Sequence, residues 1–217
     1  MWKSAAPFAD RKDAGRFLAG KLAAFAGKDP VVEGLARGGV VVAAEIARGL
    51  RCGMDVIIAG KLRAPDNPEL AIGAIAEDGT VYLNNNVIKG LGVSREYLES
   101  EKAGRLEAVR AKLALYRKVK EKTPIRGKTV IIVDDGLATG STMIAAVQAA
   151  HASGAKEIVA AVPGGPLDTV NRLRSMPEIT EVVCPVVPEL FFAVSQLYLD
   201  FRQTEDDEVA AILRELA

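Results

Sequence analysis

The sequence predicts an α/β fold in which a mostly parallel sheet is flanked by helices, in three layers. Short apolar runs such as Thr129–Val133 have the pattern of buried strands. They alternate along the chain with segments of helical periodicity, an order that is typical of parallel sheets joined by helical crossovers. The 217 residues are 49% hydrophobic, which suffices for a single domain with a substantial core.

The first part of the chain begins with a helix that Asp10 can cap, because an aspartate oxygen accepts hydrogen bonds from free backbone N–H groups. A strand, a helix and a second strand are then expected at 31–36, 40–50 and 54–60. The stretch 61–70 is polar and rich in turn-forming residues, and it is predicted to be a loop. Two short apolar runs flank Glu77-Asp78-Gly79, which indicates a hairpin.

The middle of the chain carries one long helical pattern, from Ser94 to about Val119. Its apolar residues form one stripe and are Leu98, Leu106, Val109, Leu113 and Tyr116. We expect this stripe to pack against the sheet or against a subunit partner. The elements expected after it are strands at 129–133, 157–162 and 182–187 and helices at 142–153 and 167–174. Thr204 is predicted to cap a last helix, with Asp207 in a shortened capping box.

The charge balance and the hydropathy exclude several classes of protein. Lys and Arg together number 28, as do Asp and Glu, so the chain has no global basic field for nucleic acid. No apolar run reaches the ~18 residues of a membrane span, and the first residues lack the apolar core of a signal peptide. We expect a soluble, cytoplasmic protein with no nucleic-acid or membrane partner. Cys52 and Cys184 are expected to be reduced core thiols.

The stretch VIIVDDGLATGST, residues 130–142, is the most informative part of the sequence. Asp134 and Asp135 directly follow a predicted buried strand. The loop that leads from them into the next helix consists of Gly136, Leu137, Ala138, Thr139, Gly140, Ser141 and Thr142. In open α/β sheets, ligands bind at the carboxyl ends of the strands, so this loop lies where a ligand is expected.

The residue types of this loop match a sugar phosphate. A helix N-terminus offers free N–H groups and partial positive charge, which suit a phosphate, and Gly140 permits close approach of the backbone. Thr139, Ser141 and Thr142 add hydroxyl donors. The carboxylates would repel a phosphate but can accept hydrogen bonds from sugar hydroxyls. We interpret the stretch as a pocket for ribose 5-phosphate; the alternative is a loop whose aspartates only cap backbone groups.

VIIVDDGLATGST resembles the motif by which type I phosphoribosyltransferases bind phosphoribosyl pyrophosphate (PRPP). The resemblance extends, more weakly, from about Asp10 to Val187. It is strongest to predicted, poorly characterised bacterial phosphoribosyltransferases that carry a Gly-Leu-x-Arg-Gly-Gly loop. It implies the type I phosphoribosyltransferase fold with a small hood region, in a single domain at 1–217. A helical insertion that forms a hood or an interface is then expected at about 84–122, and acceptor-side elements at about 184–217.

The resemblance assigns two further loops. GLARGGV resembles the pyrophosphate-binding loop, whose residues here are Ala36, Arg37, Gly38 and Gly39. Glycine N–H groups and the donor fork of Arg37 suit phosphate oxygens; the alternative is a plain turn. Lys61 and Arg63 resemble the basic residues that open a flexible catalytic loop. There they would neutralise the departing pyrophosphate; the alternative is that they are ordinary solvated charges.

The implied reaction transfers ribose 5-phosphate from PRPP to a nitrogen acceptor, expected to be a nucleobase, and releases pyrophosphate. Arg37, Lys61 and Arg63 are the residues expected to act in catalysis. Mg²⁺ is expected to bridge pyrophosphate and ribose oxygens, with no residue of the chain assigned as its ligand. The resemblance also suggests a homodimer. The alternative is a regulatory protein that binds PRPP or a nucleotide without turnover, although the chain lacks a basic stripe for nucleic acid.

The sequence does not identify the acceptor. Phe191, Phe192 and Tyr198 lie near the C-terminus and could stack on a planar base, and we take Phe192 as the candidate. The alternative for each ring is core packing. Gly136 and His151 are two further residues with expected positions. Gly136 stands where better-known family members usually carry an apolar residue, so we expect a more flexible loop that still binds phosphate. His151, the only histidine, is expected to lie on a helix face.

Overall fold

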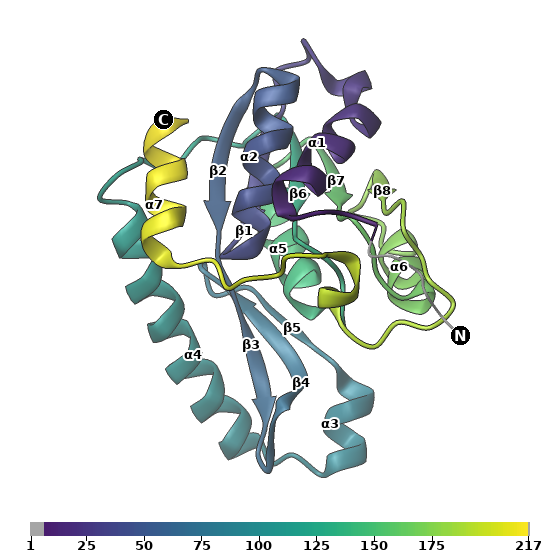
Figure 1. The fold of residues 1–217 in the computed structure, drawn as a ribbon. Helices are drawn as coiled ribbons and strands as arrows, with labels where there is room; N and C mark the ends of the chain where they lie inside the picture. Colours follow the sequence, from purple (N-terminus) through teal and green to yellow (C-terminus); the bar gives the residue numbers. More distant parts are fainter. Residues whose placement is uncertain (1–6, 217) are drawn as a thin grey trace.

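The computed structural model describes residues 7–216, except for the side chain of Glu69. Its centre is a parallel sheet of five strands in the order β2-β1-β6-β7-β8 (Figure 1). The strands are β1 Val31–Leu35, β2 Gly53–Ile57, β6 Thr129–Val133, β7 Glu157–Ala161 and β8 Glu181–Val183. β1, β6 and β7 are buried over nearly their whole length because both faces of the sheet are covered. The α/β fold class predicted from the sequence is confirmed.

Helices cover the sheet on two sides. One face packs against α1 Arg11–Lys21, α2 Gly38–Leu50 and α7 Asp206–Glu215. The other face packs against α5 Ser141–Ala152 and α6 Leu167–Arg174. Asp10 caps α1 as predicted, because its side chain accepts a hydrogen bond of 2.7 Å from the N–H of Asp13. The cap predicted for the last helix is wrong: Glu205 is the N-cap of α7, and Thr204 is a buried residue before it.

A second sheet of three antiparallel strands lies beyond the carboxyl end of β2 (Figure 1). Its strands are β3 Ala59–Ala64, β4 Asn67–Ala76 and β5 Val81–Leu83. The predicted hairpin is confirmed as β4 and β5, which pair in antiparallel register. The loop predicted at 61–70 is wrong, because most of it belongs to the antiparallel pair β3–β4. Leu62 and Ala64 are buried on one face of β3, and this burial outweighs the polar composition of the stretch.

Two helices cover one face of the small sheet: α3 Asn85–Leu91 and α4 Arg95–Tyr116. Leu62 and Ile72 of the sheet form a separate apolar core with Leu98 and Leu106 of α4. The apolar stripe predicted on this long helix therefore packs against a sheet. Figure 1 shows α4 running beside β3, from α3 to the region of α7. In the described structure, helices of the segment 84–122 thus pack against the small sheet. The assignment of this segment as a hood or an interface stays a prediction.

Residues 185–205, which we call the strap, cross the carboxyl end of the main sheet before α7 begins (Figure 1). The strap contains a short 3-10 turn, η2 Val194–Leu197, and it pairs with the N-terminal segment. The N–H of Phe8 donates to Leu197, and the N–H of Leu199 donates back to Phe8, at 3.1 and 2.9 Å. Phe8, Leu197 and Tyr198 share one small apolar cluster. The N-terminal segment and the strap therefore form one layer over the end of the sheet.

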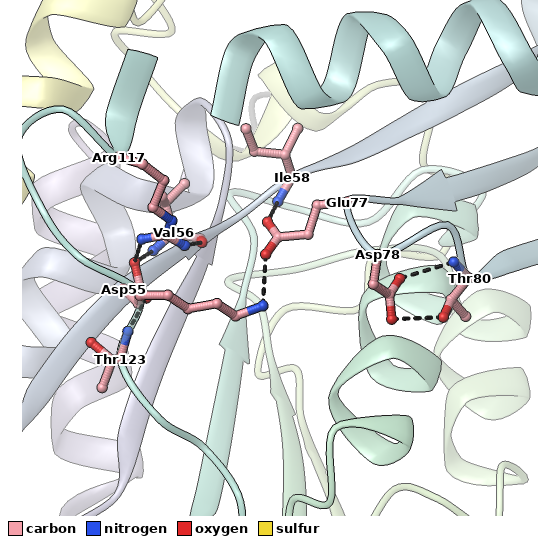
Figure 2. Close-up of polar contacts among 9 residues, drawn as sticks. Asp55, Val56, Ile58, Glu77, Asp78, Thr80, Arg117 and Thr123 are labelled. Atoms are coloured by element: carbon pink, nitrogen blue, oxygen red, sulfur yellow. Dashed lines mark hydrogen bonds and ion pairs between the residues drawn. The ribbon is translucent and has the colours of Figure 1, made fainter. Parts of the chain in front are cut away.

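Two buried carboxylates pair with cations of the segment that follows α4. Asp55 is fully buried and accepts hydrogen bonds of 2.7 Å from Arg117 and from the N–H of Thr123 (Figure 2). Glu77 pairs with Lys122 at 2.9 Å. Buried carboxylates are tolerated where hydrogen bonds and opposite charges satisfy them, so these two pairs fix the return of the chain from α4 toward β6.

Glu33 lies in the same region without such a partner. It is 2% exposed and stands opposite Asp55 in the register of β1 and β2. Its Oε2 has no hydrogen-bond partner among the described residues. Burial, followed by the charges of Asp55 and Glu77, raises the pKa of Glu33 from 4.5 to about 8. At neutral pH this side chain is therefore an uncharged acid inside the protein.

The structure also bears on the two cysteines and on the helices that could cross a membrane. Cys52 and Cys184 are both free; Cys184 is buried and Cys52 is half-buried. Burial raises the pKa of each thiol to about 11, so both are unreactive at neutral pH. Among the described helices, none combines the length and the apolarity that a membrane crossing requires.

Candidate functional site

The site lies where the strand order of the main sheet reverses. β1 and β6 are neighbours, and the helices that follow them, α2 and α5, pack on opposite faces. This arrangement opens a crevice at the carboxyl ends of the two strands, the usual place for a ligand in such sheets. The structure brings to this crevice both loops predicted from the sequence: 36–39 after β1 and 134–142 after β6.

A hollow of about 210 Å³ occupies this crevice. Its lining includes Lys61 of β3 and Val194 of the strap. The rest of its lining is the loop predicted to bind ribose phosphate: Asp134, Asp135, Gly136, Leu137, Ala138, Thr139, Gly140, Ser141 and Thr142. The small sheet therefore contributes one cation to the hollow that the paired carboxylates also line.

Two side chains of α6 donate hydrogen bonds to the loop that precedes α5. Thr169 donates to the carbonyl of Ala138 at 3.0 Å, and Arg172 donates to the carbonyl of Thr139. Gly140 is the N-cap of α5 and has φ of 70°, a left-handed conformation that favours glycine. A Cβ at this position would also lie 2.7 Å from Thr169. Because the cap residue has no side chain, it offers no acceptor to the first N–H groups of α5, a condition that suits an anion.

The other loop residues divide between ligand-facing and structural positions. The hydroxyls of Thr139 and Ser141 lie 3.1 Å apart. Leu137 is 1% exposed, so its side chain belongs to the core although its backbone borders the hollow. Gly136 is buried, and a Cβ there would lie 2.6 Å from Val194. The glycine at 136 thus gives room for the strap, rather than the flexibility that we expected from the sequence.

The two carboxylates are held differently. Asp135 pairs with Arg11 of α1, whose Nε lies 2.7 Å from Oδ2. Asp134 accepts a hydrogen bond of 2.9 Å from the N–H of Asp135. Burial, and next the charge of Asp135, raise the pKa of Asp134 well above its usual range, whereas the N–H of Asp135 and the charge of Arg11 lower it. At the rim of the predicted phosphate loop, Asp135 is therefore paired with a guanidinium, whereas Asp134 is bonded to a backbone N–H.

The predicted pyrophosphate loop borders the same crevice. The Ala36–Arg37 peptide bond is cis. A Cβ at Gly38 would overlap the carboxylate of Asp135, and one at Gly39 would lie 2.6 Å from the carbonyl of Val133. Both glycines are thus required by the close approach of the two loops. Arg37 turns away toward α7 and lies 3.1 Å from Glu205.

A second hollow, of about 340 Å³, adjoins the pyrophosphate loop. It is lined by two arginines, the start of α2 and the end of the strap: Arg11, Arg37, Gly38, Phe201, Gln203 and Thr204. The sequence reasoning did not anticipate Arg11, Phe201 or Gln203 at the site. Arg11 is 124 residues from Asp135 in the chain, and no local pattern links the two.

Arg63, Phe192 and His151 lie outside the first hollow. The backbone of Arg63 is bonded to α4, and the pairing of β3 with β4 is irregular on either side of it. Phe192 is 82% exposed, so core packing is excluded for this ring. Tyr198 is buried in the strap, where core packing is the correct interpretation. His151 is exposed in the last turn of α5, on a helix face as expected.

Three comparisons relate this chain to known proteins. The family model "Phosphoribosyl transferase domain" matches residues 9–202. Two proteins of Mycobacterium tuberculosis (strains CDC 1551 and H37Rv), named "Putative phosphoribosyl transferase", are 46% identical over 206 residues. The match covers 95% of this chain and 46% of each relative, so the chain spans about half the length of these relatives. A crystal structure from Thermus thermophilus has a TM-score of 0.82 at 42% identity, and the match covers 97% of this chain and 99% of that one.

The fold and the site define an α/β protein of the type I phosphoribosyltransferase class. The predicted phosphate loop and the paired carboxylates follow one strand at the switch point, and a glycine-rich loop follows its neighbour. The chain belongs to the phosphoribosyl transferase domain family. The resemblance drawn from VIIVDDGLATGST is thereby confirmed.

Proposed function

We propose that the protein is an enzyme that transfers ribose 5-phosphate from PRPP to a nitrogen acceptor and releases pyrophosphate. The observation that carries this proposal is the hollow in which Lys61 stands with the paired carboxylates and the phosphate loop. Binding of a sugar phosphate needs only the loop and the acids. A cation that lines the same hollow also suits the charge that develops on a leaving pyrophosphate, which favours turnover.

Each part of PRPP has a proposed partner. The phosphate of the ribose lies on the hydroxyl-rich turn at the start of α5, where N–H groups and partial positive charge favour it. The ribose hydroxyls donate to Asp134 and Asp135. The pyrophosphate lies toward the loop 36–39, with Lys61 as the principal cation. The protein then acts by orientation and charge neutralisation, without a covalent nucleophile.

Arg37 and Arg63 have less direct roles in this proposal. Arg37 can serve the pyrophosphate only after it leaves Glu205, with which it is paired at 3.1 Å. Arg63 would need a change in the β3–β4 hairpin to reach the first hollow. We therefore rank Lys61 above both as the catalytic cation.

Mg²⁺ is proposed to enter with PRPP. The groups that line the hollow carry carboxylate and hydroxyl oxygens, the donor type that Mg²⁺ prefers, so the site fits this ion. The ion would be held by pyrophosphate and ribose oxygens, and when bound it would neutralise charge on the pyrophosphate.

The acceptor is proposed to be a nucleobase, on the strength of the family resemblance. Its pocket would lie beneath the strap, whose rings and amide can stack on and hydrogen-bond a planar base. The same resemblance supports a homodimer that acts in the cytoplasm.

Phosphorus NMR of PRPP and Mg²⁺ tests the proposal. The spectrum is recorded without protein, with protein, and after addition of a pool of purine and pyrimidine bases. We expect a pyrophosphate signal that requires both protein and bases, and dividing the pool then identifies the acceptor.

Other outcomes contradict the proposal at different points. Broadened PRPP signals with no pyrophosphate from any nucleobase would favour the regulatory PRPP-binding protein and overturn the proposed nucleobase transfer. Unchanged PRPP signals would overturn the assignment of the loop 134–142 to ribose phosphate.

A further inference from the structure

Arg11 reaches the site from α1, outside the loops that form it. We propose that Arg11 is a positioning residue that orients Asp135 to accept a hydrogen bond from a ribose hydroxyl. The inference rests on the proposed function, because it assumes that Asp135 meets the sugar. It adds a residue of the N-terminal segment to the recognition of ribose.

The guanidinium of Arg11 is fixed by several contacts. Its Nε donates to Asp135 at 2.7 Å, and its Nη1 donates to the carbonyl of Arg202 in the strap, also at 2.7 Å. Its central carbon lies 4.0 Å from the centre of the Phe201 ring. The side chains of Arg11 and Asp135 are 11% and 16% exposed. A planar donor fork held at these points leaves the carboxylate little freedom to rotate.

Asp135 is also held through its backbone. The hydroxyl of Tyr198 donates to the carbonyl of Asp135 at 2.5 Å, and Tyr198 is 5% exposed. Arg11 bonds to Oδ2, and Asp135 lines the hollow. The carboxylate thus belongs to a fixed group that borders the space for a ligand.

The ion pair exists because residue 38 is glycine. A Cβ on Gly38 would overlap Oδ2 of Asp135 and would lie 2.8 Å from Nε of Arg11. Any side chain at this position would displace one of the two partners. The pair therefore joins the start of α1, the pyrophosphate loop and the paired acids at one point.

Charge gives Arg11 a second effect. Burial, followed by the charge of the adjacent Asp135, raises the pKa of Asp134, and the opposite charge of Arg11 lowers it. Lys61 faces the same hollow, and the phenol of Tyr198 packs beside the pair. Ionised carboxylates accept stronger hydrogen bonds from hydroxyls than neutral acids do. Removal of Arg11 would thus disturb both the orientation and the charge of the sugar-binding groups.

Calorimetric titration with four ligands tests the inference: inorganic phosphate, ribose 5-phosphate, and its analogues lacking the 2- or the 3-hydroxyl. For the unmodified protein, we expect loss of at least one hydroxyl to weaken binding about tenfold, as for a hydrogen bond to a charged group. In Arg11→Ala, this preference should fall to about twofold or less for one hydroxyl. Affinity for inorganic phosphate should be unchanged, which also reports a folded phosphate loop.

Two further variants make the test specific. Arg11→Lys keeps the charge but loses the fork, and it should retain part of the preference; this variant also decides the matter if Arg11→Ala does not fold. Arg16→Ala removes another arginine of α1, which pairs with Asp13 and Glu45 instead, and it should behave as the unmodified protein. An undiminished hydroxyl preference in Arg11→Ala, or in Arg11→Lys if only that variant folds, would overturn the inference alone. Absence of any preference in the unmodified protein would instead overturn the proposed function.

Discussion

The guanidinium of Arg37 lies 3.1 Å from a carboxylate oxygen of Glu205, the residue that precedes α7. Asp206 lies 4.0 Å from the same nitrogen and accepts a hydrogen bond of 2.6 Å from Tyr116 of α4. The start of α7 therefore competes with any phosphate for Arg37, because a guanidinium engaged by a carboxylate has fewer donors to offer.

Glu205→Gln should release Arg37 toward the pyrophosphate loop. We expect the affinity for pyrophosphate to rise about threefold, while the free energy of unfolding changes by less than ~1 kcal/mol because the pair is exposed. Titration calorimetry and urea unfolding measure the two quantities. Glu215→Gln, which breaks the pair with Arg48 at the other end of α7, is the matched control. Equal pyrophosphate affinities in both variants would show that Glu205 does not restrain Arg37.

Lys61→Ala should lower kcat more than it raises KM for PRPP. Lys61 lines the same hollow as the paired acids, and its charge is expected to be needed most when pyrophosphate departs. We expect kcat to fall roughly 100-fold with KM changed less than about threefold, as measured by initial rates. Lys89→Ala, on the exposed side of α3, serves as the control. A rise in KM that accounts for the whole loss would reduce Lys61 to a simple binding contact.

The double variant Asp134→Asn, Asp135→Asn should weaken PRPP binding. Loss of one ionised acceptor for a sugar hydroxyl costs ~1.5–3 kcal/mol, which corresponds to at least about tenfold in affinity. Binding of inorganic phosphate should remain, because the turn at the start of α5 keeps its contacts with α6. Unchanged affinity for PRPP would remove the ribose assignment of this loop.

Phe192→Ala should leave stability unchanged, because a ring that is 82% exposed makes little contact in the folded protein. If the ring stacks on the acceptor, KM for the base rises by about tenfold while KM for PRPP stays constant. Steady-state rates with each substrate varied in turn separate the two constants. Equal changes in both would place the ring outside the acceptor pocket.

Glu33 predicts a pH dependence of stability. Its folded-state pKa of about 8 lies above the ordinary value of 4.5, so between these values the folded protein binds more protons than the unfolded chain. Stability should therefore decrease as pH rises from 4.5 and reach its full loss above about 8. Glu33→Gln should match the unmodified protein near pH 4 and exceed it by ~2–4 kcal/mol at pH 9. Urea unfolding at several pH values measures the free energy of unfolding, and the exposed Glu181→Gln serves as the control. The prediction is contradicted if the free energy of unfolding depends on pH in the same way for Glu33→Gln and the unmodified protein.

Much of the site could be predicted because it is local in sequence. The run Val130–Val133 is apolar without interruption, and acids, glycine and hydroxyls follow it in consecutive positions. A buried strand that ends in such a loop has few other interpretations. The same holds for α6, whose bounds match the predicted 167–174, since its apolar spacing and its flanking turns agree.

The remainder depends on contacts between distant parts of the chain. The pairing of Arg11 with Asp135 spans 124 residues and follows from the docking of the N-terminal segment on the strap. The hairpin of β3 and β4 was not predicted because its strand residues alternate with charged ones, and the cluster that buries Leu62 includes residues of the later helices α3 and α4. Burial of Glu33 was not foreseen either, because one acid in a strand usually marks a solvated face.

Helix α4 contacts two elements that border the candidate site, β3 and the start of α7. Near its start, Tyr97 donates to a backbone carbonyl of β3, the strand that carries Lys61. In its last turn, Tyr116 holds Asp206 beside Arg37. Its 22 residues make a rod about 33 Å long at the usual rise per residue. Such a rod connects the two regions directly, so a tilt of α4 would shift the strand that carries Lys61 and the carboxylate beside Arg37 together.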